Sequence, residues 1–226
     1  MKYISYDEKL VNDIERILVK KNLSNDNAGH DIFHFRRVLK NAIFICESEF
    51  VDCDMQVIHV ASMLHDVHRV MSKDICEYIP PHQSIPVIEN ILDELKMSLT
   101  EEQKKMIFGC IKHHEDYKVT MRRDFPKELY IIQDADNLDA IGVTGFIRAI
   151  QYGAKLKEPF YDSDEDVTLN EGDYIEGSHL TKSTLRHMQH KLLRIPRFLK
   201  TKTAIEMSNQ EMEDLNILIK KCEVAW

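Results

Sequence analysis

Hydrophobic residues recur every three or four positions along most of the chain, which is the spacing of an amphipathic helix. In the first such segment, residues 5–21, Leu10, Ile14, Ile17 and Leu18 share one face. The same spacing predicts further helices, at residues 31–49, from 52 or 54 to the LHDVHR segment, at 84–96, from 101 toward 114, twice within 126–153, at 178–194 and at 203–223. Helix-breaking residues are few, with 7 Gly and 6 Pro. The pattern therefore predicts an all-α fold.

Polar residues at the ends of the predicted helices support these boundaries. Asp31 precedes the second helix and is expected to cap it, and the Thr100 to Gln103 segment has the pattern of a capping box. Residues 157–177 are acidic and lack any hydrophobic period, so we interpret them as a surface loop and a candidate lid. Because no internal repeat or clear linker divides the chain, we predict a single domain over residues 1–226.

Composition narrows the function classes. Apolar residues make up 43% and charged residues 30% of the chain, which is typical of a soluble globular protein. The net charge of -8 argues against binding to a nucleic acid polymer, which requires many Lys and Arg residues. The five cysteines are odd in number and form no CxxC pair, so free thiols are expected. Since neither a signal peptide nor a membrane-spanning run is visible, we predict a cytoplasmic protein with no membrane contact.

Histidine and aspartate residues follow apolar residues in several of the predicted helices. His65 and Asp66 are adjacent at the end of an apolar segment, and Asp134 follows the apolar run at 130–132. Because an unpaired buried carboxylate is costly, one cation shared by the two aspartates would satisfy both. Imidazole nitrogen and carboxylate oxygen together suit Mn, Fe, Zn, Co or Mg. The pattern therefore predicts a divalent metal site with open positions for water and a phosphate oxygen.

The order of these residues resembles the signature of the HD superfamily of metal-dependent phosphohydrolases. That signature is an isolated histidine, a His-Asp pair on a later helix and a distant aspartate, matched here by His34, His65, Asp66 and Asp134. The HFRRV segment that begins at His34 is similar to the first family motif. The QDADNLDAIG segment and the later PFYD segment resemble the bacterial YedJ/YpgQ-like branch. The resemblance covers roughly residues 28–207.

This resemblance implies an HD-domain-like helical bundle with a central metal site held by the four residues just named. It also implies hydrolysis of a phosphate ester or anhydride. Some relatives in this branch cleave nucleoside triphosphates to the monophosphate and pyrophosphate, so the expected partner is a small phosphorylated substrate such as a nucleotide. One divalent ion is expected, with Mn or Mg favoured, and a second is left open through His82 and His114.

The proton carrier of such a reaction is not obvious from the sequence. Relatives usually have an acidic residue shortly after the His-Asp pair, whereas residues 67–70 here read VHRV. We therefore expect Asp66, through its free oxygen, or His68 to move the proton while a metal-activated water attacks phosphorus. The unperturbed pKa of histidine lies near neutrality, which makes His68 suited to this role.

Further residues are candidates for holding the substrate or the metal ligands. Arg37, His114 and Lys191 are expected to bind the substrate, although Arg37 is equally suited to pair with a nearby carboxylate. Asp139 is expected to accept a hydrogen bond from a ligand imidazole and so fix its orientation. Its neighbour Asp136 is expected to be exposed.

Two other classes of function stay open. The absence of acidic residues after the His-Asp pair favours a non-catalytic sensor that binds a metal or a nucleotide without turnover. A di-iron oxygenase would need more ligands, which makes His82 and His114 decisive. The oligomeric state is left open.

Overall fold

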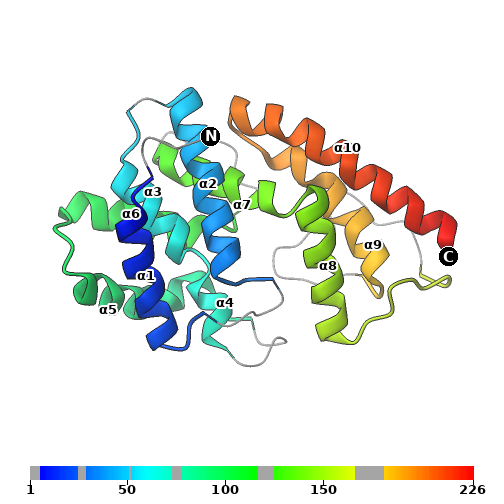
Figure 1. Ribbon diagram of the computed structural model, residues 1–226, viewed down its shortest axis with the longest axis horizontal. Coiled ribbons are helices and arrows are strands. Elements are labelled where there is room, and N and C mark those ends of the chain that lie inside the picture. Colours follow the sequence, from blue (N-terminus) through cyan, green and yellow to red (C-terminus); the bar gives the residue numbers. More distant parts are fainter. Residues whose placement is uncertain (1–5, 25–28, 51, 73–77, 117–124, 166–180) are drawn as a thin grey trace.

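The computed structural model describes residues 6–24, 29–50, 52–72, 78–116, 125–165 and 181–226, and it confirms the predicted all-α fold (Figure 1). Its helices are α1 (Glu8–Lys20), α2 (Ile32–Glu49), α3 (Met55–Leu64), α4 (Val67–Met71), α5 (Ile85–Leu95), α6 (Glu101–His113), α7 (Lys127–Asp139), α8 (Gly142–Leu156), α9 (Thr184–His190) and α10 (Lys202–Ala225). Within the described residues, the 3-10 segments η1 (Pro81–Ser84) and η3 (Leu192–Phe198) lie between these helices. Most of the predicted lid, from residue 166 onward, lies outside the described residues.

The predicted capping residues form the contacts expected of them. Asp31 accepts a hydrogen bond from the backbone N–H of His34 at 2.7 Å. Thr100 and Gln103 form both hydrogen bonds of a capping box at the start of α6. At the start of α3, the cap is Asp54. These side chains satisfy backbone donors that a helix leaves unpaired at its first turn.

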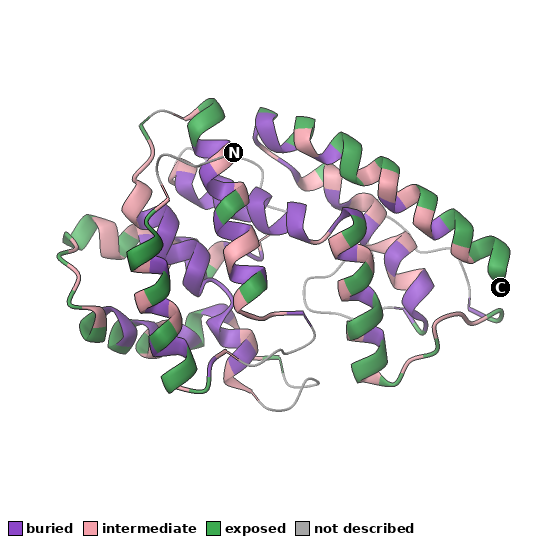
Figure 2. Ribbon diagram, in the orientation of Figure 1, coloured by how far each residue is buried: buried purple, intermediate pink, exposed green. Residues whose placement is uncertain are grey.

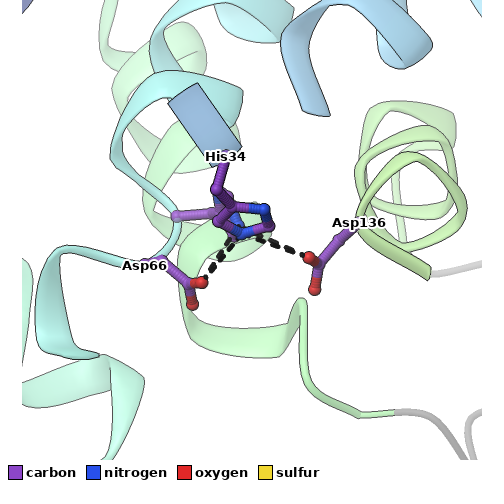
Figure 3. Close-up of side chains that lie close together, drawn as sticks. His34, Asp66 and Asp136 are labelled. Carbon is purple, nitrogen blue, oxygen red and sulfur yellow. Dashed lines mark hydrogen bonds and ion pairs between the residues drawn. The ribbon is translucent and has the colours of Figure 1, made fainter. Parts of the chain in front are cut away.

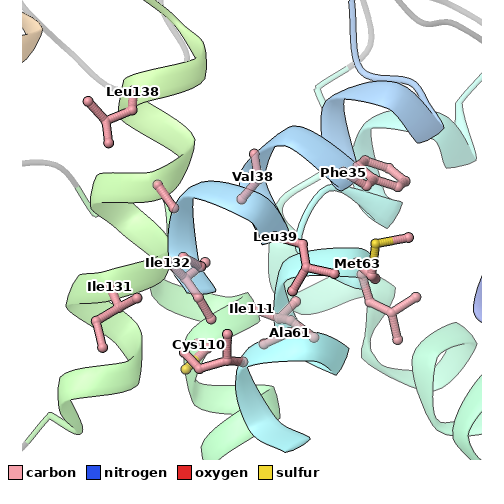
Figure 4. Packing of buried hydrophobic residues seen from close by; sticks show 14 of the residues in the cluster. Phe35, Val38, Leu39, Ala61, Met63, Cys110, Ile111, Ile131, Ile132 and Leu138 are labelled. Carbon is pink, nitrogen blue, oxygen red and sulfur yellow. The ribbon is translucent and has the colours of Figure 1, made fainter. Parts of the chain in front are cut away.

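The core is built around α2, which packs against α7 on one side and α3 on the other. Figure 4 shows apolar side chains from α2, α3, α6 and α7 meeting there, among them Phe35, Leu39, Ile111 and Ile132. Each of these four side chains is fully buried. Burial of one such side chain contributes about 1.5–3 kcal/mol, so this packing fixes the relative positions of the helices that carry the candidate site.

Helix α7 crosses the middle of the molecule between α1–α6 and α8–α10 (Figure 1). It is buried along almost its whole length, whereas the outer face of α10 is exposed (Figure 2). On the far side of α7, α8 packs against α10 and α9. Among the described residues, no helix combines the length and the apolar character needed to cross a lipid bilayer.

Candidate metal centre

A break between two helices places His65 and Asp66 at the same point in space. Helix α3 ends at Leu64, and α4 begins at Val67. His65 still has helical backbone angles, but Asp66 leaves them, with φ -100 and ψ 16. In a continuous helix, adjacent side chains diverge by about 100°. The break therefore allows the imidazole and the carboxylate to converge.

Four side chains from three parts of the fold meet at this break. The Nε2 atom of His34 lies 3.2 Å from Nε2 of His65, 3.1 Å from Oδ2 of Asp66 and 3.5 Å from Oδ1 of Asp136. Figure 3 shows the Asp66 and Asp136 carboxylates on either side of the His34 ring. All four side chains are largely or fully buried. We name this set, His34, His65, Asp66 and Asp136, the primary cluster.

The hydrogen bonds of the two imidazole rings fix which nitrogen faces the primary cluster. Nδ1 of His65 lies 2.8 Å from the carbonyl oxygen of Ser62, and a carbonyl can only accept, so Nδ1 carries the proton. Nδ1 of His34 likewise donates to Oδ2 of Asp139 at 2.7 Å. In the neutral rings both Nε2 atoms therefore direct lone pairs at each other. Two such lone pairs and two carboxylates around one point are the donor set of a divalent cation.

The charges of the primary cluster also favour a cation. Burial lowers the pKa of His65, but Asp66 and Asp136 outweigh this effect and raise it to about 10. Burial raises the pKa of Asp136, and the neighbouring His65 outweighs that effect and holds it well below its usual range. The carboxylates therefore stay ionised, and either a proton or a metal ion must balance them.

The structure places Asp136 in this cluster and not Asp134, which the sequence had favoured. The Asp134 carboxylate accepts hydrogen bonds from the backbone N–H of Lys200, at 2.9 Å, and of Thr201, at 2.6 Å. Thr201 is the N-cap of α10, so Asp134 joins α7 to the start of the last helix. The expectation that Asp136 is exposed is wrong, because only 9% of its surface is accessible.

Asp139 lies directly behind His34 and is shared with two arginines. One of its oxygens accepts from Nδ1 of His34, and Arg37 donates to both oxygens, at 2.5 and 3.1 Å. Arg148 donates to the same carboxylate at 2.9 Å. Burial raises the pKa of Asp139, but His34 and the two arginines outweigh it and lower the pKa overall. Asp139 is thus an ionised acceptor that fixes the His34 ring, and Arg37 forms the carboxylate pair that the sequence had left open.

A second set of buried polar side chains lies beside the primary cluster. Nε2 of His114 is 3.3 Å from Oδ1 of Asp66, and Nε2 of His68 is 3.3 Å from Oε1 of Glu115. His68, His114 and Glu115 are all buried, and Glu115 also accepts hydrogen bonds from Arg69 and Tyr78. His114 therefore contacts the same aspartate as the primary cluster, whereas His68 is directed at Glu115.

The remaining candidates are distributed around these groups. His30, which was not among the predicted site residues, follows Gly29, and its Nδ1 atom lies 2.5 Å from Oδ2 of Asp66. The sequence signal for His30 is its position four residues before His34, because residues four apart at the start of a helix lie on the same side. His82 is exposed on η1.

Lys191 is partly buried, and charged groups on both sides of the primary cluster act on it. Burial and the nearby Arg69 and Arg148 lower the pKa of its ammonium group, whereas Glu115 and Asp136 raise it, and the net shift is downward. Lys191 therefore interacts electrostatically both with Asp136 of the primary cluster and with Glu115 of the second set.

The match to known families covers the elements that build this site. Residues 32–141 match the model of the HD domain. This segment begins with α2, ends just after α7 and contains the whole primary cluster. The match confirms, over these residues, the resemblance to HD domains that the motifs predict.

Individual relatives point to the same branch. YpgQ of Bacillus subtilis (strain 168) is 24% identical, over 92% of this chain and 90% of its own. The structure of YpgQ in complex with ADP has a TM-score of 0.66 at 23% identity, covering 95% of this chain and 97% of that one. An HD-superfamily hydrolase from Bacillus thuringiensis has a TM-score of 0.65 at 26% identity, covering 97% and 95%. The chain is therefore similar to YpgQ over most of its length and shares the fold of these structures.

Proposed function

We propose that this protein is a divalent-metal-dependent phosphohydrolase that cleaves a phosphate ester or anhydride of a nucleotide. A nucleoside triphosphate, converted to the monophosphate and pyrophosphate, is the substrate that we expect. The observation that carries the proposal is the convergence of two imidazole lone pairs and two ionised carboxylates in the primary cluster. The B. thuringiensis relative is an HD-superfamily hydrolase, which supports the reaction class, and the ADP bound to YpgQ supports the substrate class.

In this proposal the metal ligands are His34, His65, Asp66 and Asp136. When bound, a divalent ion there lowers the pKa of a coordinated water and withdraws charge from a phosphoryl oxygen. Mn or Mg remains the favoured ion, although the same donors accept Co, Zn or Fe. Asp139 holds the His34 ring in the orientation that presents Nε2 to the ion.

Cationic side chains close to the cluster would hold the phosphate groups. Lys191 is the best placed of them, because burial already lowers the pKa of its ammonium group and an anionic ligand would compensate that cost. Arg37 is engaged with Asp139, so we assign it first to orienting that carboxylate and only secondarily to substrate. His114 contacts Asp66, a proposed metal ligand, and is therefore close enough to the site to contact a bound substrate.

The two residues expected to carry the proton, His68 and Asp66, both have contacts within the site. Nδ1 of His68 is directed at the carbonyl oxygen of His65, and its Nε2 atom is directed at Glu115. His68 would have to give up one of these contacts to protonate a leaving group. Asp66 likewise contacts His34 through Oδ2 and His114 through Oδ1, so each of the two expected acid–base residues would have to exchange an existing contact to move a proton.

The test is a substrate panel on the purified full-length chain after metal removal. ATP, GTP, ADP and p-nitrophenyl phosphates are incubated with Mn, Mg, Co or Zn, and the nucleotide products and pyrophosphate are separated and quantified. We expect metal-dependent release of monophosphate and pyrophosphate, and no turnover in the Asp136→Asn variant. Binding of nucleotide without turnover under every metal would instead favour the sensor, and oxygen consumption by an iron-loaded form would favour the oxygenase.

A further inference from the structure

Two cysteines meet where α2 ends and α3 begins. Cys46 lies in the last turn of α2, and Cys53 precedes Asp54, the cap of α3. The backbone of Phe50 joins them, because its N–H donates to the carbonyl oxygen of Cys46 at 2.9 Å and its own carbonyl oxygen accepts from the N–H of Cys53 at 3.3 Å. The two thiol groups hydrogen-bond to each other, and both are free thiols. The turn therefore places two unlinked sulfurs in contact.

Side chains of α6 and α7 hold this turn in place. The N–H of Asp54 donates to Oε1 of Glu128 at 3.1 Å, and the Asp54 carboxylate accepts from the side-chain amide of Gln103 at 3.0 Å. Lys127, the first residue of α7, forms an ion pair with Asp52. These contacts fix the residues on either side of Cys53. The contact between the thiols is therefore built into the packing of four helices.

The two thiols differ in their access to solvent and in their acidity. Cys46 is only 1% exposed, whereas Cys53 is partly exposed. The hydrogen bond with Cys46 lowers the pKa of Cys53, and Lys127 acts in the same direction against burial and Glu128. The hydrogen bond with Cys53 and burial raise the pKa of Cys46. Because the thiolate is the nucleophile, Cys53 has the character of an attacking thiol and Cys46 that of a second, resolving thiol.

Two other cysteines of the described residues have different surroundings. Cys110 is fully buried, and burial raises the pKa of its thiol. Cys222 is partly exposed on α10, and burial and the nearby Glu223 raise its pKa. Cys222 therefore resembles Cys53 in exposure but lacks the features that favour a thiolate, which makes it a matched control.

We propose that Cys46 and Cys53 form a redox-sensitive dithiol that closes to a disulfide by exchange with a small-molecule disulfide. The Cys53 thiolate attacks one sulfur of that molecule, which forms a mixed disulfide and releases the other sulfur as a thiolate. Cys46 then gives up its proton and attacks the sulfur of Cys53, which releases the second small thiol. The protein loses two electrons and two protons, and the small disulfide gains both to become two thiols.

The closed form would link the end of the helix that carries His34 to the start of the helix that leads into His65 and Asp66. In a reducing compartment the pair stays open, and an oxidising shift closes it. Neither cysteine belongs to the primary cluster or to the second set of side chains beside it. The inference therefore stands independently of the proposed hydrolysis.

The experiment uses the reduced full-length protein in glutathione buffers with a rising fraction of oxidised glutathione. Remaining thiols are blocked with iodoacetamide, and the chain is cleaved after Glu47 or Glu49, between the two cysteines. Fragments that carry Cys46 and Cys53 then stay joined only if the disulfide has formed, which mass spectrometry detects. We expect a joined and unblocked pair of fragments that dithiothreitol separates. In the reduced protein, Cys53 should react with iodoacetamide at least about tenfold faster than Cys222.

Variants separate the two steps of the exchange. Cys46→Ser should stop at the mixed disulfide and keep one glutathione on Cys53. Cys53→Ser should leave Cys46 unmodified, and the control Cys222→Ser should form the link as the wild type does. Far-ultraviolet circular dichroism confirms that each variant folds.

Three results would overturn the proposal. One is a folded wild-type protein in which Cys46 and Cys53 stay separate at every glutathione ratio. Another is a Cys222 that reacts with iodoacetamide as fast as Cys53. The third is glutathione attached to Cys46 in folded Cys53→Ser, because Cys46 would then not depend on its neighbour.

Discussion

Helix α7 has two faces whose carboxylates serve different parts of the molecule. On one face, Asp134 accepts backbone hydrogen bonds from Lys200 and Thr201 and joins the helix to the start of α10. On the other face, Asp136 contacts both imidazoles of the primary cluster, and Asp139 holds one of them. All three carboxylates are buried, so burial alone does not distinguish an architectural acid from a metal ligand.

The difference lies in the partners that each carboxylate finds. Asp134 is satisfied by neutral N–H donors of the protein backbone, which are permanent parts of the fold. Asp136 faces imidazole lone pairs and another carboxylate, so it is satisfied only by a cation or a proton. Four predictions, from the largest expected effect to the smallest, separate the two faces.

Removing the charge of Asp136 should have the largest effect. The Asp136→Asn variant keeps the shape of the side chain but loses a charged ligand, so we expect metal affinity to fall by more than about 100-fold, beyond the effect usual for outer contacts. Activity should fall in parallel. Isothermal titration with Mn²⁺ and steady-state kinetics measure the two effects, and wild-type affinity in this variant would remove Asp136 from the ligand set.

Asp134 should instead affect stability. In Asp134→Ala the buried N–H groups of Lys200 and Thr201 lose their acceptor, which should lower the free energy of unfolding by about 3 kcal/mol. Urea denaturation measures this loss. Metal affinity of the folded variant should equal that of the wild type, and a selective loss of metal with unchanged stability would return Asp134 to the ligand set.

Asp139 should show an intermediate effect on the metal. Asp139→Asn replaces the charged acceptor for Nδ1 of His34 with a weaker neutral one and holds the ring less firmly, so we expect metal affinity to fall by about 10–100-fold. Asp136→Asn provides the upper limit for comparison in the same titration. A loss as large as that of Asp136→Asn would mean that Asp139 contacts the ion itself.

The smallest effect is expected for Arg37, whose side chain is 38% exposed. Because Arg148 still pairs with Asp139 in an Arg37→Gln variant, stability should change by less than about 1 kcal/mol and metal affinity by only a few-fold. The Michaelis constant for nucleotide decides between its two expected roles. A rise of tenfold or more with unchanged metal affinity would show that Arg37 also contacts phosphate.

The helices could be predicted because their signals are local. Amphipathic spacing and the capping residues Asp31, Asp54 and Thr100 lie within the segments that they define. The sequence does not distinguish Asp134 from Asp136 as the ligand on α7, because this helix is buried all round and its sequence then lacks the apolar period that would show which face is which. The i, i+3 spacing of Asp136 and Asp139 does show that these two share a face.

The other differences arise from contacts between distant parts of the chain. Nothing near Asp134 indicates that its carboxylate meets the backbone of Lys200, 66 residues later. Glu115 likewise becomes part of the site only because α6 packs against α3, which leads into the His-Asp pair. Such pairings depend on how helices pack, and periodicity in one sequence does not encode them.

The bond between Asp134 and the start of α10 also sets a rule for engineering this protein. Helix α10 ends at Ala225, and Val224 beside it is 90% exposed, so a group attached near this point meets solvent. A deletion that includes Lys200 has a different effect, because it removes a backbone N–H that donates to the buried Asp134 carboxylate. Shortened versions for crystallography or display should therefore stop before that junction, however dispensable the exposed surface of the helix looks.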